Sequence, residues 1–91
     1  MIREYLLVIN KLGLHARAAA KLVRLASTFK SEIYLSRENA NQRIDSKSIL
    51  GILMLQASMG TRLVISISGD DEVKAFEAIQ QLFESRFGED S

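Results

Sequence analysis

The sequence predicts a two-layer α+β fold in which helices cover one side of a small, mostly antiparallel sheet. Residues 62–68 alternate between apolar and polar side chains, as a strand with one buried face does. Residues 16–29 and 72–87 repeat apolar side chains at spacings of three and four, which is typical of amphipathic helices. With the shorter segments between them, the order of elements is βαββαβα. A chain of 91 residues has room for one domain, which we expect to span residues 1–91.

The first half of the chain predicts three strands and one helix. Residues 2–9 are rich in apolar and β-branched side chains and form the first strand. Residues 16–29 form the first helix, because their alanines strongly favour helix. Residues 32–36 and 43–45 form two further strands, joined by a polar hairpin loop at 38–42. The apolar stripe predicted for the first helix is Ala16, Ala19, Ala20, Val23, Ala26 and Phe29.

A short helix is predicted at residues 49–55. Asp45, Ser46 and Ser48 precede it, and each is a residue type that caps helix N-termini. Gly51 weakens a helix interior, so we expect it to serve close packing or a bend. The helix is apolar nearly all round and too short to bury every side chain against one core. Some of these side chains should therefore be exposed: Ile49, Leu50, Ile52, Leu53, Met54 and Leu55.

The last strand and the last helix follow directly. Residues 62–68 form the strand, and the turn at 69–71 leads into a helix at 72–87 with acidic residues in its first turn. The face of this helix predicted to meet the core is Val73, Phe76, Ile79, Leu82 and Phe83.

The composition excludes several classes of protein. Hydrophobic residues make up 47% and charged residues 25%, which is ordinary for a folded globular chain and argues against disorder. No apolar run approaches the roughly 18 residues of a membrane span, and the first residues do not resemble a signal peptide. Zero cysteines and one histidine leave no disulfide and no conventional zinc site. We expect a cytoplasmic protein without metal or cofactor.

The net charge of +1 conceals an uneven distribution. Residues 1–30 carry six basic residues and one acidic residue, whereas residues 70–91 carry two basic and seven acidic ones. The basic third could attract phosphate groups, nucleic acid or an acidic protein surface. It could equally be one of two solvated faces.

The single histidine lies where the first helix begins. His15 follows a glycine turn at Gly13, and free backbone N–H groups and the positive end of the helix dipole favour its neutral, nucleophilic ring. The same groups would stabilise the anion formed if the ring were phosphorylated. Arg17 adds a bidentate donor for phosphate oxygens. A packing histidine, or an anion site that never reacts, would have the same sequence.

Two motifs carry a family resemblance over essentially the whole chain. The segments Gly13-Leu-His15-Ala-Arg17-Ala-Ala and Lys47-Ser48-Ile-Leu-Gly51-Ile-Leu-Met-Leu55 resemble the HPr phosphocarriers of the bacterial phosphoenolpyruvate-dependent phosphotransferase system. The resemblance implies an HPr-like open-faced sandwich, with four antiparallel strands covered on one side by three helices.

The resemblance also implies roles for individual residues. His15 would accept a phosphoryl group at Nδ1 from phosphorylated enzyme I and pass it to IIA domains of sugar transporters, with Arg17 beside the phosphoryl group. The protein would be a covalent phosphohistidine intermediate rather than an independent enzyme. Ser48 would be the regulatory serine of an HPr kinase/phosphorylase. Ile49, Leu50 and Leu53 would form the partner-docking patch.

The sequence departs from the family pattern at two places. Ala18 stands where the family usually has proline, which presets φ in a first helical turn, so its effect on transfer rate is open. The loop at 38–42 is slightly longer than usual, and we attach no function to it.

The sequence also allows other functions and other branches of the family to be considered. RNA-recognition domains share the order βαββαβ, but their base-stacking aromatics are missing from strands 43–45 and 62–68, so we expect no nucleic-acid partner. A purely regulatory binding module is a further alternative. Within the family, Leu12 and the tail at 82–90 favour a nitrogen-related regulatory branch, whereas Lys47-Ser48-Ile favours kinase-regulated members. We expect a monomer that does not insert into membranes, and Ser48 could be only a helix cap.

Overall fold

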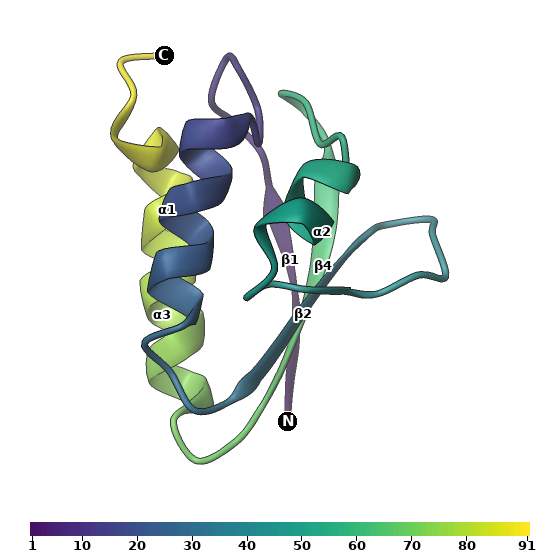
Figure 1. Ribbon diagram of the computed structural model, residues 1–91, viewed down its shortest axis with the longest axis vertical. Helices are drawn as coiled ribbons and strands as arrows, with labels where there is room; N and C mark the ends of the chain where they lie inside the picture. Colours follow the sequence, from purple (N-terminus) through teal and green to yellow (C-terminus); the bar gives the residue numbers. More distant parts are fainter.

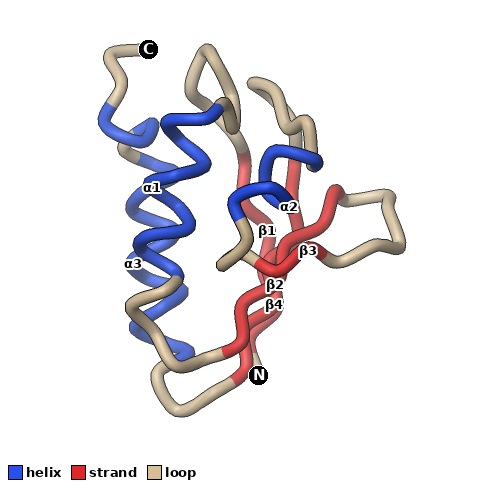
Figure 2. The backbone as a smooth tube through the Cα atoms, viewed as in Figure 1, coloured by secondary structure: helices blue, strands red, loops and turns tan.

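The computed structural model describes residues 1–91 and has the predicted order of elements (Figures 1 and 2). The strands are β1 (Ile2–Leu7), β2 (Glu32–Arg37), β3 (Ile44–Asp45) and β4 (Arg62–Ser68). The helices are α1 (Ala16–Ala26), α2 (Ile49–Met54) and α3 (Glu72–Glu84), and a 3₁₀ turn, η1 (Arg86–Gly88), follows α3. None of these helices is long and apolar enough to cross a membrane.

The four strands form one antiparallel sheet in the order β1-β4-β2-β3. Residues 63–67 of the central strand β4 are all buried. Val64 and Ser66 are cross-strand neighbours of Tyr5 and Tyr34, respectively, and all four lie on the face away from the core. The helices lie on the other face, with α1 and α3 antiparallel and side by side (Figure 1). The predicted two-layer α+β sandwich, open on one face, is confirmed.

Helix α1 begins where predicted but turns a different stripe toward the sheet. It ends at Ala26 rather than Phe29, because the N–H groups of Thr28 and Phe29 donate to carbonyls three residues back in a terminal turn. The prediction of Ala16 as a core residue is wrong, since it lies exposed in the first turn. The buried residues of α1 are Ala18, Ala19, Leu22 and Ala26, which are spaced by three and four.

Helix α3 also ends earlier than predicted, at Glu84 rather than at residue 87. The α-helix cannot continue because Arg86 and Phe87 adopt left-handed backbone conformations, with φ of 57° and 56°. The prediction of Val73 as a core residue is wrong, since its side chain is 58% exposed. The buried residues of α3 are Ala75, Ile79 and Phe83, at a regular spacing of four.

Helix α2 has the predicted excess of exposed apolar surface. Only Ile52 of its six residues is buried, whereas Leu50 is 68% exposed. Ser48 is the N-cap, because its Oγ accepts a hydrogen bond from the N–H of Gly51 at 3.2 Å. Gly51 does serve close packing, since a Cβ there would lie 2.7 Å from Cγ2 of Ile44.

Candidate functional site

A glycine turn sets the position of the loop between β1 and α1. Gly13 has φ of +68°, and a Cβ on it would lie 2.4 Å from the carbonyl oxygen of Ala57. The next residue, Leu14, is buried and donates its N–H to that same oxygen at 2.8 Å. The loop before α1 is therefore docked on the loop after α2, and His15 follows at a defined place.

His15 is the N-cap of α1. Its backbone is extended, with φ −74° and ψ 179°, and its carbonyl accepts the N–H of Ala19 at 2.8 Å. Its Nδ1 accepts the backbone N–H of Arg17 at 3.3 Å. An atom that receives an N–H carries no proton of its own, so this contact assigns the ring proton to Nε2. Nδ1 is thus an unprotonated nitrogen beside the free N–H groups of a helix N-terminus.

Arg17 has a guanidinium free to meet an anion. Its side chain is exposed and makes no hydrogen bond or ion pair within the protein. His15 and Arg17 line one surface hollow, together with Leu12, Ala16, Glu89, Asp90 and Ser91. The helix start therefore brings the two predicted site residues to the same surface.

Two further residues belong to this site and were not predicted. One oxygen of the Glu89 carboxylate contacts Nε2 of His15, and the other accepts from the side-chain amide of Asn10 at 3.0 Å. The same amide nitrogen donates to the carbonyl of Gly13 at 2.8 Å. Asn10 is fully buried. Its two N–H groups therefore connect the C-terminal segment to the turn that precedes His15.

The hydrogen bond from Asn10, and then the one from His15, hold the pKa of Glu89 below that of an ordinary carboxyl. Glu89 is therefore ionised at neutral pH, where its contacts stabilise the folded state. Because the folded-state pKa is lowered, this contribution is lost as the pH falls through that pKa.

The segment after α3 is held so that Glu89 reaches the histidine. Phe87 is fully buried, and its ring centroid lies 4.9 Å from that of Phe83. Nζ of Lys21 donates to the carbonyl of Phe87 at 2.6 Å. The carbonyl of Ser91 accepts the N–H of Lys11 at 3.0 Å. In Figure 1 this C-terminal segment lies at the same end of the molecule as the start of α1.

Six exposed apolar side chains lie on α2 and on the two loops next to it, and we call this group the docking patch after the role proposed for it below. The patch is built on α2 and extends over the neighbouring loops, since the loop before α1 contacts the loop after α2. Its members are Ile49, Leu50, Leu53, Met54, Leu12 and Met59. Only the first three were predicted as docking residues; Met54 was predicted as an apolar residue of this helix, and the contribution of the two loops was not foreseen.

Of the two serines flanking Lys47, only Ser48 is accessible. Ser46 is fully buried and its Oγ has no hydrogen-bond partner. Ser48 is exposed at the start of α2. Nζ of Lys47 donates to the carbonyl of Phe29 at 2.9 Å and so is directed toward the end of α1.

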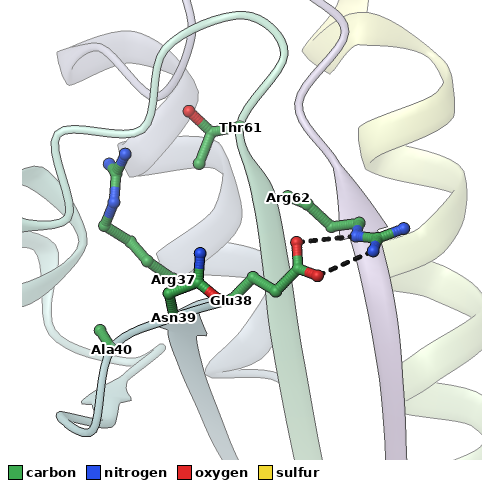
Figure 3. Close-up of a pocket in the computed structure, with 6 residues that line it drawn as sticks. All are labelled: Arg37, Glu38, Asn39, Ala40, Thr61 and Arg62. Atoms are coloured by element: carbon green, nitrogen blue, oxygen red, sulfur yellow. Dashed lines mark hydrogen bonds and ion pairs between the residues drawn. The ribbon is translucent and has the colours of Figure 1, made fainter.

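A second hollow lies beside the hairpin loop and is drawn in Figure 3. There, Arg62 forms a bidentate ion pair with Glu38, with distances of 3.0 and 2.7 Å (Figure 3). Arg37 donates to the carbonyls of Leu55 and Gln56 at the end of α2. Both guanidinium groups already have partners within the protein, so we assign no ligand to this hollow.

Comparisons with known proteins cover nearly the whole chain. A family model for the HPr component phosphorylation site of the phosphotransferase system matches residues 2–85. The chain belongs to the HPr family. The phosphocarrier protein HPr of Xylella fastidiosa (strain 9a5c) is 47% identical over 91 residues, which is 100% of both chains. The phosphocarrier protein NPr of Proteus mirabilis is 43% identical over 81 residues, 89% of each chain.

The structural comparison agrees with the sequence comparison. The crystal structure of an HPr from Thermoanaerobacter tengcongensis matches with a TM-score of 0.93 and 42% identity, covering 100% of both chains. The resemblance to HPr proteins is thus confirmed, and with it the role of a bacterial phosphocarrier in the phosphotransferase system.

Replacing Gly13 with alanine is expected to lower the free energy of unfolding by about 2–4 kcal/mol, measured by urea denaturation. An alanine at this position would have to keep the unfavourable φ of +68°. Its Cβ would lie 2.4 Å from Ala57 O and 2.8 Å from Ser58 Cα, both backbone atoms. Gly60→Ala is the matched control, since Gly60 has φ of +92° but no atom within 4 Å of such a Cβ. Equal losses in the two variants would mean that backbone conformation, not the docking of the two loops, accounts for the effect.

Proposed function

We propose that this protein carries a phosphoryl group on Nδ1 of His15, received from phosphorylated enzyme I and passed to IIA domains of sugar transporters. One observation carries the proposal. Nδ1 is unprotonated, lies at the start of α1, and is engaged only by a long hydrogen bond of 3.3 Å from Arg17 N–H. Its electron pair is therefore available to a phosphorus atom entering from the hollow that His15 and Arg17 line.

Both transfer steps use the same atoms. In the first, the electron pair of Nδ1 forms a bond to phosphorus while the bond from phosphorus to the donor atom of enzyme I breaks and returns its electron pair to that atom. The phosphoryl oxygens then lie beside the backbone N–H groups at the start of α1 and the guanidinium of Arg17. In the second step a nucleophile of the IIA domain takes the group by the reverse route. No metal or cofactor takes part.

The docking patch beside this hollow supports a role in binding both partners. Four exposed apolar side chains on one six-residue helix are a usual feature of protein-binding surfaces. Ile49, Leu50 and Leu53 would contact enzyme I and the IIA domains, and basic residues of α1 would meet acidic groups of these partners.

Ser48 is proposed as a regulatory site, modified by an HPr kinase/phosphorylase. Phosphate at a helix N-cap is compatible with the fold, because it lies near free N–H groups and the favourable end of the dipole. It would also add roughly two negative charges beside Leu50 and weaken apolar docking. The alternative is a purely structural role, in which Ser48 only caps α2.

A second candidate function is phosphocarrier of the nitrogen-related branch, which the similarity to an NPr favours. A third is a regulatory binding module that acts through α2 alone. In each case we expect a monomer working in the cytoplasm, without nucleic acid or membrane insertion.

Incubation with phosphoenolpyruvate and enzyme I should give an acid-labile, base-stable phosphoprotein, and His15→Ala should take up no phosphate. The reason is that His15 is the only histidine in the chain. Supplying the sugar-branch and nitrogen-branch enzymes I in parallel, and comparing initial rates, separates the two branches. Acid-labile label in His15→Ala would refute the assignment, and no label on the wild type with either enzyme would favour the binding module.

Leu50→Asp should weaken binding to enzyme I at least tenfold, measured by titration calorimetry, while changing stability by no more than about 0.5 kcal/mol. The side chain is 68% exposed, so its loss removes little from the core. Val73→Asp is the control, since it makes the same apolar-to-acid change at a side chain that is 58% exposed on α3. If both variants bind equally well, the docking patch does not include Leu50.

Ser48→Asp should slow phosphorylation of His15 severalfold with little change in melting temperature, because aspartate can also cap α2 and places a negative charge at the docking patch. Ser68→Asp adds the same charge at an exposed position on the end of β4 and should leave the rate unchanged. Ser46 is unsuitable as a control because it is buried. A normal rate in Ser48→Asp would reduce Ser48 to a helix cap.

A further inference from the structure

The carboxylate of Glu89 is held rigidly against the reactive ring. One oxygen contacts Nε2 of His15, the other accepts from Asn10, and the Glu89 side chain is only 14% exposed. Asn10 is 0% exposed, and its amide orientation is fixed by a second acceptor, the carbonyl of Gly13. A carboxylate restrained in this way is different from a mobile surface ion pair, which contributes little.

The chain adopts unfavourable backbone conformations to bring Glu89 to this place. Arg86 and Phe87 are non-glycine residues in the left-handed region, which residues with a side chain seldom adopt. Burial of Phe87 and the hydrogen bond from Lys21 keep the segment in this conformation. Strain that the surrounding structure maintains is characteristic of functional sites.

We propose that Glu89 is a positioning residue for phosphoryl transfer: it holds the proton on Nε2 of His15, so that Nδ1 presents its electron pair to phosphorus. This inference rests on the proposed role of His15 as acceptor. Two contacts determine the tautomer from opposite sides of the ring, because Arg17 N–H donates to Nδ1 and Nε2–H donates to Glu89. A carboxylate that orients a histidine in this way is a common device in hydrolases and at metal sites.

The carboxylate also has a role during the step itself. When Nδ1 forms its bond to phosphorus, the donor atom of enzyme I recovers the electron pair of the broken bond and the His15 ring gains positive charge. The proton stays on Nε2 and remains donated to Glu89, so no proton has to leave. The negative carboxylate stabilises this charge, and it lies on the side of the ring away from the incoming phosphoryl group.

Glu89→Ala should lower the initial rate of phosphorylation by enzyme I by about tenfold or more. Glu77→Ala is the matched control, because it removes the same side chain and the same charge at an exposed position of α3 that does not line the hollow. Its rate should stay within twofold of the wild type. Glu89→Gln retains an oxygen that can accept from Nε2–H but lacks the charge, so its rate should lie between those of the wild type and Glu89→Ala.

A second measurement separates positioning from general support of the fold. In proton–nitrogen NMR spectra the wild type and Glu77→Ala should show a slowly exchanging, downfield Nε2–H signal, which Glu89→Ala should lose while remaining folded. Absence of that signal from the wild type, or its persistence in Glu89→Ala, would overturn the proposal. So would a rate for Glu89→Ala within twofold of the wild type. A wild type that takes up no phosphoryl group would instead refute the proposed function, whereas the NMR signal would still test the hydrogen bond.

Discussion

The buried amide of Asn10 is the contact on which the geometry of the site depends. Its single nitrogen donates both to the turn before His15 and to the carboxylate behind the histidine ring. Its oxygen, in return, is buried without a partner, and leaving such a group unsatisfied costs about 1–3 kcal/mol. The amide cannot flip to satisfy the oxygen, because both acceptors would then lose their donor. The fold accepts this cost in order to hold two segments that are far apart in sequence around one imidazole.

The arrangement of the layers explains why this end of the molecule is available to partners. Small residues of α1 bring the helix close to the sheet, and α3 packs beside it, so the core is complete without the apolar residues of α2 other than Ile52. Helix α2 can therefore present most of its side chains to solvent. The site is at the end of the helical layer where α1 begins (Figure 1). The first backbone N–H groups of any helix have no partner within the helix, so hydrogen-bond donors are available there.

Much of the fold could be predicted because local patterns determine it. The bounds of β4 follow from its run of apolar and β-branched residues, the start of α1 follows a glycine turn, and both were correct. The end of α3 was predicted three residues late, because the apolar pattern continues through Phe87 and the left-handed position after the C-cap is occupied by Arg86 rather than by glycine. Val73 was misplaced because a spacing of three fits the helix as well as the spacing of four that the core uses.

The site was only half predictable for a different reason. His15 and Arg17 are two residues apart, so one helix start brings them together, and the sequence contains that information. Glu89 and Asn10 are separated by nearly the whole chain, and their contact depends on the burial of Phe87 and on two left-handed residues. No periodicity or spacing encodes such a contact. The excess of acidic residues in the last part of the chain was the only available signal, and it had an equally good explanation as a solvated face.

That charge asymmetry has a structural consequence at the site. The acidic C-terminal segment does not lie apart from the basic start of the chain, because Glu89 contacts His15 and the backbone of the segment accepts from Lys21 and Lys11. The groups that touch the ring nevertheless differ between its two nitrogens. The Glu89 carboxylate contacts Nε2, whereas Nδ1 accepts the backbone N–H of Arg17 at the start of α1. Because phosphate carries about two negative charges, the difference between the two nitrogens favours Nδ1 over Nε2 as the acceptor in the transfer proposed above.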